Sequence, residues 1–186
     1  NCMGKFQSIV IACSVILNVI NTNAREIKVM SYNIRLDVAL DGENRWDARK
    51  EKVAALMNYY EADFIGGQEV QYHQLRYLLS LLPDYSFIGV GRDDGKQAGE
   101  YSCIFYKKDK FTLIQQSTFW LSPTPDSVSK GWDAAIVRIC TYGLFKNIKT
   151  KQLIWVFNTH FDHIGKIARL ESAKLIIKKI KEVNTK

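Results

Sequence analysis

The segment Asn158-Thr-His-Phe-Asp-His163 holds the densest group of side chains that could do acid–base chemistry. It follows the apolar run 153–157, which is typical of a buried strand, so Asn158 and His160 fall on one face of that strand. Strand ends in an open α/β sheet form the rim where ligands bind. There His160 could transfer protons or polarise a phosphoryl oxygen, although a lone histidine more often has a structural role.

Two further strand ends carry side chains that suit a hard metal ion. Glu69 ends the apolar strand predicted at 62–69, and Asn33 lies near the end of the strand predicted at 26–34. Mg²⁺ prefers oxygen ligands, so Glu69 and Asn33 are the candidate metal ligands, with Mn²⁺ as the alternative ion. Taken alone, a solvated turn carboxylate would explain Glu69, and a local turn would explain Asn33. Together with His160, they predict one polar site built from distant segments.

Two arginines could bind phosphate oxygens at such a site. Arg35 follows Asn33 by two residues, and Arg138 lies within the strand predicted at 133–143. A guanidinium group pairs well with phosphate because its N–H groups form a planar fork. For Arg138, a buried ion pair, for example with Asp133, is the alternative.

Three other residues could act beside them. Tyr101 begins a predicted strand, where its hydroxyl could reach a phosphate or its ring could simply pack. Asp162 precedes a predicted helix, which it could cap, or it could orient an imidazole. His163 is its neighbour and a candidate for substrate binding.

The spacing of apolar residues predicts alternating helices and strands after residue 25. The last helix is expected to bury Ala173, Ile176, Ile177 and Ile180. Several strands are apolar on both faces, so they must be covered on two sides. We therefore expect an α/β fold in which two sheets pack together with helices outside. Helices are predicted at 46–61, 71–82 and 165–182, and strands at 26–34, 62–69, 85–91, 101–107, 110–120, 133–143 and 152–160.

Length and charge set broad limits. The chain of 186 residues is long enough for one domain with a sizeable core, and its net charge of +7 favours anionic partners. Phosphate esters, nucleic acid and a membrane surface all fit. Lysines clustered in the last predicted helix account for much of the charge, so it does not choose among these partners.

The first residues have the pattern of an export signal. Met3-Gly-Lys5 gives a basic start, the run 9–20 is almost entirely apolar, and small residues follow it. That run is too short to span a bilayer comfortably. We predict a signal peptide at 1–24, a domain at 25–186, no stable membrane span after cleavage, and a periplasmic or extracellular location. A lipoprotein anchor at Cys13 is the alternative.

Cys103 and Cys140 both lie in predicted strands. They could pair in an exported protein. Isolated cysteines within strands are more often buried thiols, which is the interpretation we favour.

Four segments together resemble the endonuclease/exonuclease/phosphatase superfamily, the fold of deoxyribonuclease I-like enzymes. Two shorter segments also look like a secreted bacterial branch of it. The resemblance extends over 26–184, with the segments in the expected order. The four are Met30-Ser-Tyr-Asn-Ile34, Gly67-Gln-Glu-Val70, Gly99-Glu-Tyr-Ser-Cys-Ile-Phe-Tyr106 and Asn158-Thr-His-Phe-Asp-His163, and the shorter two are Trp132-Asp-Ala-Ala135 and Ala168-Arg-Leu-Glu-Ser-Ala173.

The resemblance implies a four-layer α/β sandwich and Mg²⁺-dependent hydrolysis of a phosphate ester by a metal-activated water. The substrate would be a nucleic acid, a phospholipid headgroup or a small phosphoester, and either a diester or a monoester. Glu69 would hold the metal with Asn33 beside it, His160 would bind or protonate the scissile phosphate, and Tyr101 would line the site. Some nucleases of the family carry Asp where this chain has Arg35, so no metal role for Arg35 follows.

Two motifs of the family's second half, Gly-Asp-x-Asn and Ser-Asp-His, are absent from the 186 residues. In the family they supply the Asp that orients the attacking water and a second His. We therefore expect an N-terminal portion of the domain, with its C-terminal part missing and with little hydrolysis on its own. The rival hypotheses are a non-catalytic binding domain of the same fold and a half-domain that needs a partner chain. The oligomeric state stays open.

Overall fold

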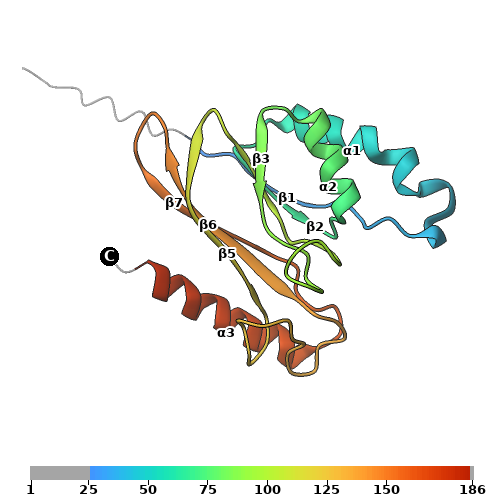
Figure 1. Ribbon diagram of the computed structural model, residues 1–186, viewed down its shortest axis with the longest axis vertical. Helices are drawn as coiled ribbons and strands as arrows, with labels where there is room; N and C mark the ends of the chain where they lie inside the picture. The colour runs from blue at the N-terminus through green and yellow to red at the C-terminus, as the bar shows by residue number, and fades with distance from the viewer. Residues whose placement is uncertain (1–25, 185–186) are drawn as a thin grey trace, which may run out of the picture.

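A computed structural model describes residues 26–184, which form two β-sheets with helices on their outer faces (Figure 1). The signal peptide predicted at 1–24, and with it the alternative anchor at Cys13, lies outside the described residues. Among residues 26–184, no helix combines the length and the apolar character that crossing a membrane requires.

The first sheet is mixed, with strand order β1-β2-β4-β3. β1 (Val29–Asn33) runs parallel to β2 (Phe64–Gln68), with Asn33 opposite Gln68. β4 (Ile104–Lys107) is antiparallel to β2 and to β3 (Tyr85–Ile88). Because β1 and β2 are parallel, the residues that follow them leave the sheet at the same end.

The second sheet is antiparallel throughout. It consists of β5 (Phe111–Trp120), β6 (Ile139–Asn147) and β7 (Leu153–Thr159), in that order. The pairing of β5 with β6 shifts register between Leu113 and Gln115. His160 follows the last residue of β7, so the second sheet also ends at a polar segment.

Helices cover the two outer faces. α1 (Trp46–Tyr60) and α2 (Tyr72–Leu81) lie against the first sheet, and α3 (Lys166–Val183) lies against the second (Figure 1). A short 3-10 helix, η1 (Ala39–Asn44), joins β1 to α1.

Three clusters of buried residues correspond to the three interfaces between these layers. The first packs Phe105 with residues of α1 and α2, and the second joins the inner faces of the sheets around Phe64 and Phe145. The third packs Tyr142 with residues of α3. Neighbouring residues of β4 divide between clusters, as the two-residue period of a strand requires. This arrangement confirms the predicted four-layer α/β sandwich.

The strand predicted at 133–143 is wrong in its first half, because β6 begins only at Ile139. The reason is that polar side chains near α3 bind backbone N–H groups of this region. The carboxylate of Asp133 accepts the backbone N–H groups of Ile167 (3.3 Å) and Ala168 (2.6 Å) at the start of α3. Together with the hydrogen bond from the backbone N–H of Ile136 to Asp162, this contact holds residues 133–136 beside the start of α3 instead of in the sheet. The predicted strands 85–91 and 101–107 are likewise shorter in the structure.

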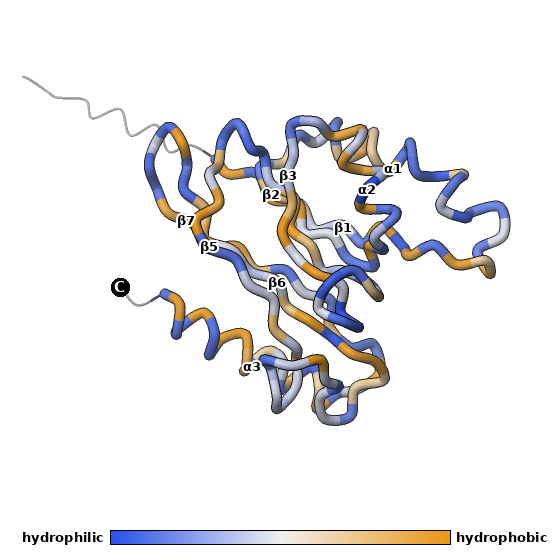
Figure 2. The backbone as a smooth tube through the Cα atoms, viewed as in Figure 1, coloured by the Kyte–Doolittle hydropathy of each residue, from blue (hydrophilic) through white to orange (hydrophobic). Residues whose placement is uncertain are grey.

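The predicted buried face of α3 is wrong for two residues. Ile177 is 53% exposed and Ile180 is 38% exposed, whereas Ala168 and Ser172 are buried. Figure 2 shows apolar and polar residues alternating along this helix, so the sequence offers more than one apolar stripe to the sheet. The structure packs the stripe that includes the partly buried Leu175 and Ile176 against the second sheet.

Cys103 and Cys140 are both buried and free, as favoured from the sequence. Cys103 belongs to the cluster under α1 and α2, and Cys140 to the cluster under α3. The two thiols thus lie in different layers of the core.

Candidate functional site

The polar ends of the two sheets meet at one small, partly open hollow. It brings together four residues predicted from the sequence, Glu69, Tyr101, Arg138 and His160. It adds Arg92, Glu100, Ser102 and Ile139 to them. Residues from both sheets therefore build the site, as the positions of the strand ends predict.

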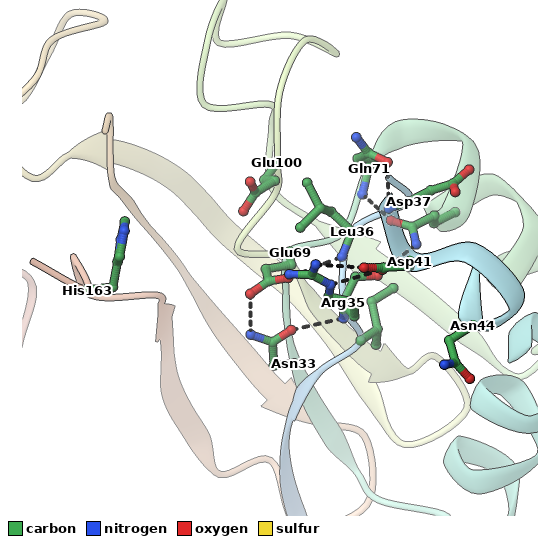
Figure 3. Close-up of polar contacts among 12 residues, drawn as sticks. Asn33, Arg35, Leu36, Asp37, Asp41, Asn44, Glu69, Gln71, Glu100 and His163 are labelled. Atoms are coloured by element: carbon green, nitrogen blue, oxygen red, sulfur yellow. Dashed lines mark hydrogen bonds and ion pairs between the residues drawn. The ribbon is translucent and has the colours of Figure 1, made fainter. Parts of the chain in front are cut away.

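Glu69 is held by two hydrogen bonds. The Nδ2 group of Asn33 donates to Oε1 at 2.7 Å, and the backbone N–H of Leu36 donates to Oε2 at 3.2 Å (Figure 3). The Oδ1 atom of Asn33 accepts the backbone N–H of Arg35 at 2.9 Å, which fixes the orientation of the amide. Asn33 therefore turns its nitrogen toward Glu69 and orients this carboxylate, with its own oxygen already engaged.

The carboxylate of Glu69 is set up to stay ionised. Burial alone would raise its pKa, but the hydrogen bonds from Asn33 and Leu36 and the nearby His160 and Arg35 outweigh burial and lower the pKa. Within residues 26–184, no group of three or more His, Cys, Asp or Glu side chains could hold a metal ion. Mg²⁺ commonly uses one or two carboxylates and keeps several waters, so Glu69 fits as a single ligand from this chain.

Arg35 brings a positive charge to the mouth of the site. Its guanidinium pairs with both carboxylate oxygens of Asp41 in η1, at 3.0 and 2.8 Å (Figure 3). Its Nη1 atom lies 4.0 Å from Oε2 of Glu69. The side chain is exposed, so it remains accessible to an anionic ligand.

Arg49, which the sequence did not single out, holds the loop that positions Glu69. From α1 it donates hydrogen bonds to the carbonyls of Ile34, Arg35 (2.6 Å) and Leu36 (3.2 Å). Its Nε donates to the carbonyl of Asn44 at 3.1 Å. No local pattern marks this arginine, because its partners are backbone carbonyls.

Replacing Arg49 with methionine is expected to lower the free energy of unfolding by about 1–3 kcal/mol, because partly buried carbonyls lose their donor. The Glu69 loop should loosen as well. The exposed Arg76 on α2 offers a matched control, since Arg76→Met removes the same group from the surface. Urea unfolding of both variants checks this expectation. Equal decreases in the free energy of unfolding of the two variants would contradict it.

The surroundings of His160 favour the neutral form of its imidazole. Burial lowers its pKa, and so does the charge of Arg138, against smaller opposing effects of Glu69 and Glu100. Its Nδ1 atom is buried and has no hydrogen-bond partner among residues 26–184. At neutral pH the ring can therefore donate one hydrogen bond and accept another.

Arg138 is held from behind by Asp162, not by Asp133. Its Nε lies 3.4 Å from Oδ2 of Asp162, and its Nη2 lies 3.2 Å from Nδ1 of His163. Asp162 also accepts the backbone N–H groups of Ile164 (3.0 Å) and Gly165 (2.8 Å). Both N–H groups precede α3, whose N-cap is Gly165, so Asp162 fixes the turn before the helix and the helix-capping alternative is wrong for it.

Asp162 and His163 do not line the hollow itself. Burial would raise the pKa of Asp162, but hydrogen bonds from the backbone at Gly165, Ala135, Ile164 and Ile136 lower it strongly. Both residues therefore hold Arg138 without lining the hollow themselves.

Tyr101 lines the hollow with a buried side chain. Its hydroxyl donates to the carbonyl of Lys96 at 2.9 Å, and burial raises its pKa to about 12. Its backbone N–H donates to the carbonyl of Val70 at 2.7 Å. In this structure Tyr101 ties the loop before β4 to the residue that follows Glu69.

Arg92 and Glu100 were also missed. They lie in the loop between β3 and β4, where their side chains pair at 2.9 Å between Nη2 and Oε1 and are only 14% and 13% exposed. Loop residues follow no helical or strand period, so only the fold brings them to the site.

The comparisons with known proteins agree with this geometry. No protein-family model matches the chain. A Bacteroides vulgatus endonuclease/exonuclease/phosphatase is 48% identical with a TM-score of 0.80, covering 84% of this chain and 59% of that protein. A Bacteroides thetaiotaomicron mannosyl-6-phosphatase is 47% identical with a TM-score of 0.83, and the match covers 85% of this chain and 60% of that protein.

More distant proteins share the fold or part of the sequence. Danio rerio TDP2 in complex with a single-strand DNA product is 17% identical, with a TM-score of 0.66, over 84% of this chain and 55% of its own. An uncharacterized protein of Acanthamoeba polyphaga mimivirus is 24% identical over 85% of this chain. The chain spans about 60% of the similar Bacteroides structures and 28% of the viral protein.

Proposed function

Because the chain belongs to the endonuclease/exonuclease/phosphatase superfamily, we propose that it contributes the Glu69–His160 site of a metal-dependent phosphoester hydrolase. The observation that carries the proposal is the convergence of Glu69 and His160, from different sheets, on one hollow that two arginines also line. A metal-binding carboxylate, a proton-transfer group and cations for phosphate oxygens are the components such a reaction needs.

Glu69 would hold the metal, with Mg²⁺ expected and Mn²⁺ as the alternative. The ion would neutralise phosphoryl charge and activate a water for attack on phosphorus. The contribution of this chain is an ionised carboxylate fixed by Asn33 and Leu36. Arg35, 4.0 Å from that carboxylate, would bind a phosphate oxygen at the mouth of the site.

His160 and Arg138 would act on the phosphoryl group. A neutral imidazole can donate a hydrogen bond to a phosphoryl oxygen or pass a proton to the leaving group. The guanidinium of Arg138, held by Asp162, would stabilise charge as it develops on the phosphoryl oxygens. These donors are fixed before substrate arrives, which is the arrangement that favours a transition state.

The substrate class is a phosphate ester. One similar protein is named a mannosyl-6-phosphatase. The proposal covers phosphate monoesters and diesters alike. Since the 186 residues contain neither the Gly-Asp-x-Asn nor the Ser-Asp-His motif, we expect them alone to hydrolyse such esters weakly. The leader pattern at 1–24 supports export to the periplasm or beyond, with lipoprotein anchoring as the alternative.

The rival function is a binding domain that has the fold without the chemistry. A decayed site would have no need of an oriented, ionised carboxylate. The contacts of Asn33 and Leu36 with Glu69, and the charge of Arg138 beside His160, favour the catalytic proposal.

Replacing Glu69 with glutamine tests the proposal. We expect Mg²⁺ affinity, measured by isothermal titration calorimetry, to fall about tenfold or more. Glu51→Gln is the matched control, because Glu51 is an exposed carboxylate on α1 and should leave the affinity unchanged. Equal affinity of the Glu69→Gln variant and the unmodified chain would reject a metal site at Glu69.

A further inference from the structure

We propose that Arg92 and Arg138 together form a phosphate cradle that selects a terminal phosphate group, as in a phosphomonoester, over a phosphodiester. This inference rests on the proposed function and narrows its substrate class. It starts from the position of Arg92, which lines the same hollow as His160 and Arg138 although it comes from a different loop.

Each guanidinium is oriented by its own carboxylate. Glu100 pairs with Arg92 at 2.9 Å, and Asp162 lies 3.4 Å from Nε of Arg138. All four side chains are largely buried, with at most 14% of any one exposed. Two cations are thus set at one hollow before any ligand arrives, which reduces the entropy lost on binding.

Both arginines retain donors beyond their carboxylate contacts. A guanidinium has five N–H groups, and one carboxylate engages only some of them. The buried Nε of Arg92 has no hydrogen-bond partner among residues 26–184, and Oδ1 of Asp93, at 3.6 Å, forms an ion pair with it that is too long for a hydrogen bond. A buried donor without an acceptor is costly, and a phosphoryl oxygen would satisfy it.

The loop that carries Arg92 is fixed in place, so the cradle does not depend on a mobile segment. The indole Nε1 of Trp120 donates to the carbonyl of Arg92 at 2.8 Å. The backbone N–H of Arg92 donates to the carbonyl of Glu100 at 3.2 Å. Tyr101 closes the same loop through its hydrogen bond to Lys96.

The charge and the free oxygens of the two esters differ. A phosphomonoester carries between about −1.5 and −2 at neutral pH, whereas a diester carries a single negative charge. Glu69 and Glu100 also line the hollow, where Glu100 pairs with Arg92 and a cation would neutralise Glu69. The monoester has one more unesterified oxygen than the diester, and the buried Nε of Arg92 is a donor that remains to meet it.

The test compares two ligands of similar size. Binding of phenyl phosphate and of methyl phenyl phosphate to the 186-residue chain would be measured by calorimetry with saturating Mg²⁺. We expect the monoester to bind about tenfold more tightly than the diester. Arg92→Met should weaken monoester binding about tenfold or more and leave diester binding within about twofold.

Two further variants keep the result interpretable. Arg92→Lys retains the charge without the planar fork, so its monoester affinity should lie between those of the unmodified chain and Arg92→Met. Arg76→Met, on the exposed surface of α2, should change neither affinity. If Arg92→Met fails to fold, the affinities of Arg92→Lys for the two esters are compared with those of the unmodified chain instead.

The possible failures can be told apart. Mg²⁺-dependent binding of both esters with equal affinity would overturn the selectivity and leave the proposed function standing. If Arg92→Met weakened the binding of both esters equally, Arg92 would only support its loop, and the inference would be overturned. Binding of neither ester would overturn the inference together with the proposed function.

Discussion

Asp162→Asn is expected to lower the free energy of unfolding by about 3–5 kcal/mol, because it leaves the buried charge of Arg138 without its partner. Asp162 and Arg138 are only 4% and 5% exposed. The carboxylate also accepts backbone N–H groups from Ile136, Ile164 and Gly165. An asparagine keeps one acceptor oxygen, so the substitution mainly removes the charge and part of the hydrogen bonding to the turn before α3.

Urea unfolding near neutral pH would measure this loss. Asp47→Asn is the control, since Asp47 pairs with Lys50 while 81% of its side chain is exposed, and such surface pairs contribute little. The pKa of Asp162 is lowered from 3.8, so its stabilisation is complete above that value and is lost as the pH falls through the lowered pKa. The two variants should therefore differ most at neutral pH. Similar decreases in the free energy of unfolding of Asp162→Asn and Asp47→Asn at pH 7 would contradict the expectation.

Asn158→Ala is expected to destabilise the protein by about 3 kcal/mol or more, because it leaves buried polar groups between the two sheets without hydrogen-bond partners. From β7, the Nδ2 of Asn158 donates to the carbonyls of Gly67 (2.9 Å) and Cys103 (2.7 Å) in and beside the first sheet. Its Oδ1 accepts Nε2 of Gln68 at 2.8 Å. One side chain therefore links both sheets immediately beneath His160.

The same contact explains a glycine in the middle of β2. A Cβ atom at Gly66 would lie 2.7 Å from Oδ1 of Asn158, closer than real contacts allow. Asn158→Ala can be compared with Asn58→Ala on the exposed side of α1, whose single hydrogen bond is 3.5 Å long. Hydrogen exchange should quicken in β2 and β7 of the first variant only. Unchanged exchange in those strands would show that the inter-sheet bridge is dispensable.

Much of the fold follows from the spacing of apolar residues. The period of Leu75 and Leu78 predicts α2, and the uninterrupted apolar run in β4 predicts a strand buried on both faces. Strand ends then place Asn33, Glu69 and His160 near one another, because only a few sheet topologies are compatible with these elements. The fold and the first members of the site could thus be predicted together.

The remaining features depend on contacts between distant segments. Asp133 and Asp162 use their oxygens on backbone N–H groups of α3 and the loop before β6, which no local period records. Arg49 binds carbonyls, and Arg92 reaches the hollow from a loop. On α3, the spacing predicts an apolar helix but cannot tell which stripe the sheet covers, so Ile177 was assigned to the wrong face.

The backbone at Arg35 and Glu69 has a consequence for engineering. Both residues adopt left-handed conformations, with φ of 62° and 58°, which glycine adopts without the penalty of about 1–2 kcal/mol that other residues incur. Glycine at either position would relieve this penalty but would remove the guanidinium or the carboxylate together with its hydrogen bonds. Glu61 and Lys151 share the left-handed conformation and do not line the hollow. Engineering for heat resistance should therefore place glycine at those two positions and keep the charged side chains of Arg35 and Glu69.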